Sequence, residues 1–233
     1  MKFNLSKIKI LNEKINLPGK PSEELAEETG LHIGDGTMNF YNNHNELKGS
    51  YALRGHITDD KEHYNKVIHK LYLKLYDLNL SLREMPKDGV YGFQKWSSNL
   101  VNFKHKILGL TLGKKLNIII PEIFTKREEF ITNSIRGIFD TDGMIYLEPK
   151  YGKFYPRIEI STISMKLGYQ LNDLIKKMGI RSTIYLDKRE NPKWHDSYKI
   201  SVRGEKMLEK WMNIIDPHNP KHQNKFQFFI NNS

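Results

Sequence analysis

The sequence contains no cysteine, which excludes disulfide bonds and thiolate metal sites. It also lacks an uninterrupted apolar run of the roughly 18 residues that a membrane span requires. Residues 1–7 include no apolar signal core, so secretion is not expected. These absences favour a protein without a membrane anchor that works in the cytoplasm, or in an organelle if the host is eukaryotic.

Acidic residues are outnumbered by basic ones. The 233 residues include 37 Lys and Arg against 27 Asp and Glu, which gives a formal net charge of +10 and a pI of about 9.4. Such a balance favours a polyanionic partner, namely DNA, RNA or an anionic membrane surface. The length fits either one large domain or two small ones.

Two short segments of the chain are copies of one pattern. Residues 30–36 read GLHIGDG and residues 137–143 read GIFDTDG, and each joins a helix-like run to an Asp-Gly pair. The two terminal aspartates, Asp35 and Asp142, are 107 positions apart, close to half the chain. A repeat at this spacing indicates a pseudo-twofold protein whose chemistry lies on the axis between two equivalent halves.

The order of elements after each copy is also repeated. Two strand-like runs, an amphipathic helix, a second strand pair and a closing helix follow each Asp-Gly. In the first half these runs fall at about 37–41, 51–57, 64–78, 80–84, 90–95 and 98–108, and in the second at about 144–148, 157–162, 167–178, 182–186, 198–203 and 204–214. The chain is therefore predicted to be α+β, with two pseudo-symmetric α-β-β-α-β-β-α halves, each an antiparallel sheet with helices on one face.

Three segments follow from this repeat. They are a basic N-terminal extension, residues 1–21, that packs on the body or touches the partner, a first half at 22–120, and a second half at 121–233. Ser22 is the predicted N-cap of the first motif helix. Thr125 and Glu128 have capping-box spacing ahead of the second motif helix.

Small residues recur on one face of each motif helix. Gly30 and Gly34 are four positions apart, and Gly137 and Thr141 take the same places in the second copy. Because a stripe of small residues lets two helix backbones approach closely, these four residues are the predicted helix interface. Packing along the stripe would bring Asp35 and Asp142 within a few ångströms of each other.

Two carboxylates held so close repel unless a cation lies between them. Hard divalent ions prefer oxygen ligands and also bind phosphate oxygens. An acid pair with metal on a basic platform is therefore a candidate phosphodiester-cleaving centre, in which the metal activates water and stabilises the leaving oxygen.

The two stretches resemble the motifs of the LAGLIDADG family, whose double-motif members are monomeric homing endonucleases. Residues 135–143, IRGIFDTDG, are the closer match, whereas residues 28–36, ETGLHIGDG, depart from the pattern at Glu28 and His32. With the repeated element order, the resemblance extends over roughly residues 22–215. One motif alone would be weak evidence for the family, but two copies at domain spacing make the resemblance specific.

This resemblance implies a fold, an activity and a cofactor. The twisted sheets would form a saddle along the DNA major groove, with Asp35 and Asp142 binding metal at the centre and each directing cleavage of one strand to leave short 3′ overhangs. Mg²⁺ is the implied cofactor, Mn²⁺ is the implied substitute for it, and Ca²⁺ would support binding without efficient turnover. Gly34 and Thr141 are further candidate metal ligands. The implied partner is double-stranded DNA with a long asymmetric target, and the implied role is intron homing.

Strand alternation then assigns the face that meets DNA. Arg, Gln and Asn can read base edges with two hydrogen bonds, so polar residues on this face are the base-reading candidates. They are Asn39, Tyr41, Arg54, His56, Gln94, Tyr146, Glu148, Arg157, Glu159, Ser161, Lys199 and Ser201. In the family, a basic residue after the fourth strand positions water or phosphate, and Lys95 or Arg203 could fill that place, with Gln94 competing if the register slips by one residue.

Alternatives remain for the function and for individual residues. An RNA-splicing maturase of the same fold would bind RNA without cleaving DNA, and a transcription regulator of this architecture usually lacks the two acids. Asp140 is either a third metal ligand or an interface residue. His218 and His222 have an H-x₃-H spacing that can serve zinc, although the neighbouring prolines favour a surface loop. The remaining alternative concerns four lysines, which are either phosphate contacts or part of a solvated face: Lys104, Lys106, Lys114 and Lys115.

Overall fold

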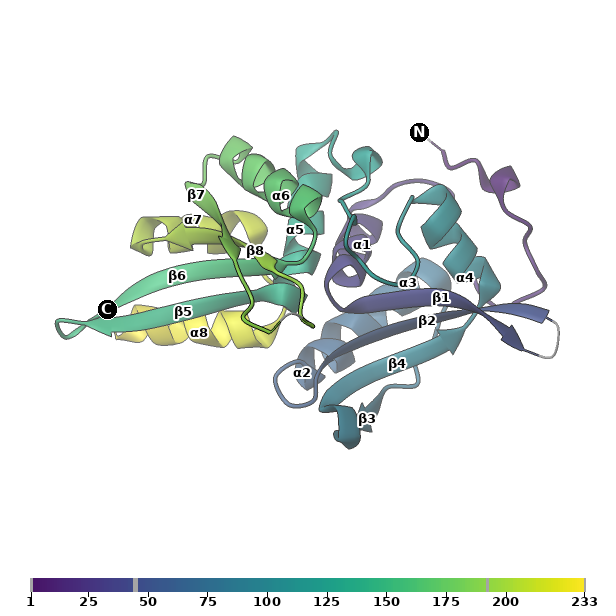
Figure 1. The fold of residues 1–233 in the computed structure, drawn as a ribbon, viewed down its shortest axis with the longest axis horizontal. Helices are drawn as coiled ribbons and strands as arrows, with labels where there is room; N and C mark the ends of the chain where they lie inside the picture. The colour runs from purple at the N-terminus through teal and green to yellow at the C-terminus, as the bar shows by residue number, and fades with distance from the viewer. Residues whose placement is uncertain (1, 44–45, 192, 233) are drawn as a thin grey trace.

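The computed structural model describes residues 2–43, 46–191 and 193–232. It contains two four-stranded antiparallel sheets with identical strand order, β1-β2-β4-β3 in the first half and β5-β6-β8-β7 in the second. Figure 1 shows the two sheets extending in opposite directions from a centre occupied by α1 and α5. The predicted α+β saddle of two equivalent halves is confirmed. No helix in the described part of the chain has the length and apolar character to span a bilayer.

Each half begins with its motif helix and continues directly into its sheet. The first half consists of α1 (Glu23–Asp35), β1 (Gly36–Asn43), β2 (Glu46–His56), α2 (Lys61–His63), a π-helical turn (Tyr64–Ile68), α3 (His69–Tyr76), β3 (Arg83–Met85), β4 (Val90–Trp96), α4 (Ser98–Asn102) and a second π-helical turn (Phe103–Ile107). The second half consists of α5 (Glu128–Asp142), β5 (Gly143–Lys150), β6 (Lys153–Thr162), α6 (Met165–Lys177), β7 (Ser182–Asp187), β8 (Ser197–Arg203), α7 (Glu205–Ile215) and α8 (Pro220–Asn231).

One of the two predicted helix starts is confirmed. The Ser22 hydroxyl accepts a hydrogen bond from the backbone N–H of Leu25, as an N-cap should. The predicted capping box of the second helix is wrong. Helix α5 begins at Glu128 after an extended Arg127, while Thr125 ends a short 3₁₀ turn and its hydroxyl bonds the carbonyl of Glu122.

The two motif helices pack backbone against backbone. A Cβ added at Gly30 would lie 3.0 Å from the Cα of Gly137 and closer still to the carbonyl oxygen of Ser134. A Cβ at Gly137 would lie 2.7 Å from the backbone nitrogen of Leu31 and collide with the carbonyl of Glu27. No side chain fits at either position, so the backbones of α1 and α5 meet at these two glycines of the small-residue stripe.

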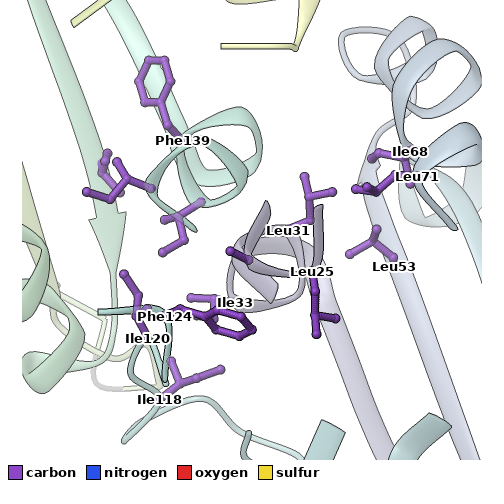
Figure 2. Close-up of a cluster of buried hydrophobic side chains, with 14 of the residues drawn as sticks. Leu25, Leu31, Ile33, Leu53, Ile68, Leu71, Ile118, Ile120, Phe124 and Phe139 are labelled. Atoms are coloured by element: carbon purple, nitrogen blue, oxygen red, sulfur yellow. The ribbon is translucent and has the colours of Figure 1, made fainter. Parts of the chain in front are cut away.

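Apolar side chains of α1 face both halves. Figure 2 shows Leu25, Leu31 and Ile33 between Phe139 of the second half and Leu53 of the first. All five are at most 3% exposed. The two sheets therefore share one continuous core through α1, and the relative position of the halves is fixed by packing.

The two departures from the motif pattern, Glu28 and His32, are also accounted for. The Glu28 carboxylate is fully buried and receives hydrogen bonds from Lys104 Nζ at 2.5 and 2.7 Å and from the hydroxyls of Tyr72 and Tyr76. The buried His32 ring stacks on Tyr51, with centroids 5.6 Å apart. A buried charge is tolerated here because it is paired and fully hydrogen-bonded.

The N-terminal extension packs on the first half. The Glu13 carboxylate accepts hydrogen bonds from the backbone N–H of Ser98, at 3.0 Å, and from the hydroxyl of Ser97 at the start of α4. Ile8 is 6% exposed, and the Phe3 ring meets Phe103 edge to face. This segment thus extends the core, the first of the two roles that the sequence left open.

Substituting Gly137 with leucine should force α1 and α5 apart. Overpacked cores lose about 1–3 kcal/mol, and here the obstacle is backbone, so we expect a loss of about 3 kcal/mol in the free energy of unfolding, measured by urea denaturation. Gly19→Ala is the matched control because nothing lies within 4 Å of a Cβ at Gly19. Equal stability of the two variants would contradict the close packing.

Candidate functional site

The C-terminal ends of α1 and α5 converge at the junction of the two sheets. A Cβ at Gly34 would lie 3.4 Å from Cγ of Asp142 and would overlap the side chain of Thr141. The negative charge of Asp142 is also close enough to raise the pKa of Asp35. The structure therefore brings together the two acids that the sequence singled out, as the repeat predicts.

The two carboxyl groups differ in environment. Asp35 is half-buried, and its Oδ2 accepts a hydrogen bond from the Tyr64 hydroxyl at 3.2 Å. Burial, with Asp142 and Asp60 nearby, raises the pKa of Asp35 to about 8. Desolvation by the surrounding protein raises the pKa of Asp142 to about 6. Asp142 is itself exposed, so contact with water moderates this rise.

Two lysines distant in the sequence offset this negative charge. Lys115, in the segment between the halves, donates hydrogen bonds to the carbonyl of Ile33 at 2.9 Å and to that of Gly34. Lys221, in α8, forms a 2.8 Å ion pair with Asp60. The charges of both lysines act to lower the pKa values of Asp35 and Asp142. The centre is thus an acid pair bordered by two ammonium groups.

Helix α8, which the sequence analysis did not predict, carries one of these lysines. The surface loop predicted around residues 217–222 is wrong. Asn219 is fully buried, caps α8 and donates to Asp60 Oδ1 and to the carbonyl of Asp140, both at 2.8 Å. His222 is also buried and stacks on Phe139. An Asn-Pro pair, N-cap followed by proline at the first helical position, was the available signal.

Between the sheets lies a hollow of about 850 Å³ that opens onto Asp142 and Lys115. Its lining comes from both halves and includes Asp142, Lys115, Asn39, Tyr41, Arg54, Gln94, Ser161, Arg189, Lys193 and His195. The last three belong to the long β7–β8 loop, which no prediction had assigned to the site. Polar and basic side chains therefore surround the acid pair on the sheet faces that the helices leave open.

Register places most of the predicted base-reading residues on this open face. Asn39, Tyr41, His56, Gln94 and Tyr146 are exposed there. The others are held by neighbours: Arg54 donates to Gln94 Oε1 at 3.1 Å, and Arg157 lies over the Tyr146 ring while pairing with Glu148 at 3.2 Å. Ser161 and Lys199 are cross-strand partners.

Two of the predicted base-reading residues are not accessible. Glu159 is only 6% exposed, since its carboxylate accepts from Lys199 Nζ at 3.1 Å and from the Tyr185 hydroxyl at 2.8 Å. Ser201 is only 2% exposed. Both residues lie on the predicted face of the sheet. The prediction that they contact DNA bases is wrong, because larger neighbouring side chains cover them.

The two basic candidates fall in different places. Lys95 pairs across the sheet with the fully buried Tyr51 and so belongs to the helix-covered face, whereas Gln94 lies on the open face. The choice of Lys95 is therefore wrong by one residue of register. Arg203 is on the open face opposite Arg157, at the level of Tyr146. That level is four residues, or about 13 Å, beyond Asp142 along the strand.

The two other ligand candidates stay predictions. The Gly34 carbonyl already accepts from Lys115. The Thr141 hydroxyl donates back along α5, to the carbonyls of Gly137 and Ile138 at 3.0 and 2.9 Å. Asp35 and Asp142 are thus the groups whose oxygens are best placed for a cation between the helix ends.

Comparison with known proteins identifies this architecture. Residues 129–216 match the family model described as a LAGLIDADG-like domain. The homing endonuclease I-DmoI superposes with a TM-score of 0.60 at 18% identity, over 84% of this chain and 97% of that one. The LAGLIDADG meganuclease I-AabMI, bound to uncleaved DNA, superposes with a TM-score of 0.52 at 11% identity, over 87% of this chain and 89% of that one. The resemblance to LAGLIDADG homing endonucleases predicted from the two motifs is confirmed.

A curated relative places a similar sequence inside a longer protein. The glutamine–fructose-6-phosphate aminotransferase of Methanocaldococcus jannaschii is 23% identical over 203 residues, which are 86% of this chain. The chain spans only 17% of the length of that relative. The similarity thus concerns one segment of a much longer polypeptide.

Replacing Asp35 with asparagine should change how stability depends on pH. A pKa raised from 3.8 to about 8 means that the folded state favours the protonated carboxyl. This contribution is complete below the unfolded-state pKa and is lost as the pH rises through the folded-state value. The metal-free protein should therefore lose stability relative to Asp35→Asn as the pH rises from about 4 to about 8, as urea denaturation across this range can measure. Parallel pH profiles would contradict the assignment.

Removing the ammonium group of Lys115 should raise the pKa values of Asp35 and Asp142 further, because its charge lowers both. The expected result for Lys115→Met is an upward shift of both carboxyl titrations, followed by ¹³C NMR of the aspartate side chains. Lys114→Met is the matched control, since Lys114 is its exposed neighbour. The idea fails if both variants titrate like the parent protein.

Proposed function

We propose that this protein is a site-specific DNA endonuclease that hydrolyses phosphodiester bonds with divalent metal held between Asp35 and Asp142. The observation that carries the proposal is the convergence of the two motif helices, which places Asp35 and Asp142 together beside an open hollow lined by polar and basic side chains, with Lys115 and Lys221 close enough to lower the pKa of both acids. The shared fold with I-DmoI, of which one structure is described as a complex with DNA and Ca and another as a complex with DNA and Mn, supports the same function.

The donor set fits Mg²⁺ or Mn²⁺. Two carboxylates supply hard oxygen ligands, and an ion between them would remove the repulsion that raises the pKa of Asp35. When bound, the metal would polarise the scissile phosphate and a water molecule. Ca²⁺ would bind the same oxygens but support little turnover.

The remaining groups of the centre act on charge and position. The ammonium groups of Lys115 and Lys221 would stabilise negative charge that develops on the phosphate. Tyr64 holds the Asp35 carboxylate through its hydroxyl. Asp60 fixes Lys221 through a 2.8 Å ion pair. These residues, more than Lys95 or Arg203, supply the basic character that the family pattern requires near the acids.

The open faces of the two sheets would bind the substrate. DNA lying across both would meet Asn39, Tyr41 and Gln94 in one half and Tyr146 and Lys199 in the other. Because the two faces carry different side chains, a single chain would recognise a long, asymmetric target as a monomer. Its phosphate contacts would make affinity fall steeply with salt. Intron homing and 3′ overhangs remain part of this proposal, as does the competing maturase activity, which would require RNA binding without DNA cleavage.

Asp35→Asn and Asp142→Asn should each suppress cleavage while leaving DNA binding largely intact. Loss of a metal-binding carboxylate should cost about 100-fold or more in rate, because the ion no longer has both ligands. The measurement is cleavage of a randomised DNA library with Mg²⁺, with binding followed separately in Ca²⁺.

Asp173→Asn, at an exposed position of α6, is the matched control and should cut like the parent protein. Cleavage that survives in both central variants would place the chemistry elsewhere. Processing of an intron RNA in the absence of DNA cleavage would favour the maturase.

A further inference from the structure

A second group of metal-ligating side chains lies where the halves meet, outside the acid pair. It consists of Glu27 in α1, Asp140 in α5 and His218 in the connection between α7 and α8. One ligand atom from each lies within 4.8 Å of the others. The proposed nuclease centre uses none of them.

Two buried atoms at this place have no hydrogen-bond partner among the described residues. Asp140 is fully buried, and its Oδ2 accepts from the backbone N–H of His218 at 2.9 Å, but its Oδ1 has no partner. His63 of α2 is 1% exposed, and its Nε2, which also lacks a hydrogen bond, lies 3.8 Å from Asp140 Oδ2. The unpaired Oδ1 leaves Asp140 with a free acceptor beside Glu27 and His218, available to an ion.

The group also brings two buried carboxylates close together, those of Glu27 and Asp140. The ring Nδ1 of His218 is 2.7 Å from Glu27 Oε1, whereas the nearest arginine, Arg136, is 3.7 Å from Oε2. One divalent ion would neutralise both carboxylates and leave His218 as a neutral ligand.

The group can be reached from solvent. A surface hollow opens onto Glu27 and His218, and the His218 side chain is 35% exposed. Two of the lysines at its rim are already paired, Lys66 with Glu62 and Lys74 with Glu24. An ion can therefore enter from this side without passing the acid pair.

We propose that Glu27, Asp140 and His218 bind a structural Zn²⁺ ion. Mixed imidazole and carboxylate ligands suit zinc, whereas Mg²⁺ prefers an all-oxygen shell. The ligands come from α1 of the first half and from α5 and the α7–α8 connection of the second. The ion would thus join the two halves and fix α8, which carries Lys221 to the central hollow.

The test uses the Asp35→Asn/Asp142→Asn double variant, in which the central acids cannot bind metal. After removal of metals by a chelator, Zn²⁺ affinity is measured by competition with a chromophoric chelator, and Co²⁺ is added separately as a spectroscopic probe. We expect one Zn²⁺ per chain, little competition from Mg²⁺, and a Co²⁺ absorption spectrum of a low-coordinate nitrogen and oxygen site. His218→Gln and Glu27→Gln should each weaken Zn²⁺ binding by about 10-fold or more.

His69→Gln, on α3 and outside the cluster, is the control and should bind Zn²⁺ like the double variant. Zn²⁺ should also raise the thermal unfolding midpoint of the double variant but not that of His218→Gln. If His218→Gln or Glu27→Gln does not fold, the Co²⁺ spectrum and the Zn²⁺ stoichiometry of the double variant test the proposal without it. Absence of stoichiometric Zn²⁺, or equal affinity in His218→Gln, would overturn the proposal. Because the tested protein lacks the central acids, either failure leaves the nuclease proposal unaffected.

Discussion

Direct backbone contact between α1 and α5 is the constraint on which the rest of the molecule depends. Gly30 and Gly137 face each other with no room for a Cβ. This contact sets the distance between the two helix axes. It also sets the distance between the first strands of the two sheets, because β1 and β5 begin at the residues that follow Asp35 and Asp142. The position of the sheets and the meeting of the two acids therefore have the same cause.

Close approach of the helix ends creates an electrostatic problem that distant parts of the chain resolve. Burial, more than the nearby acids, raises the pKa of both central acids, while Lys115 from the inter-half segment and Lys221 from α8 act in the opposite direction. Asp60 holds Lys221 at 2.8 Å and is itself held by Asn219. The two lysines thus offset part of the negative charge of the acids without forming direct salt bridges with them. Binding of an added cation by the two acids would therefore still be favourable.

The sequence was sufficient for the fold and for the acid pair because both depend on local patterns. Period-two alternation and the four-residue spacing of small residues report directly on buried faces. The prediction failed at Lys95, which was chosen over Gln94, because a shift of one residue in strand register moves a side chain to the other face of the sheet. It also failed at Glu159, because side chains from neighbouring strands cover this residue. The contribution of Lys221 could not be predicted, since no local pattern connects α8 with the ends of α1 and α5 far upstream in the chain.

The location of α8 also bears on the biosynthesis of the protein. Asp35 and Asp142 precede Lys221 and the Asn219 cap in the chain, so the two acids are translated first. A nascent or prematurely terminated chain that stops before α8 has both acids but not the ammonium group that balances them, nor the cover over Asp140. The charge balance around the two central acids is therefore completed only after α8 has been made.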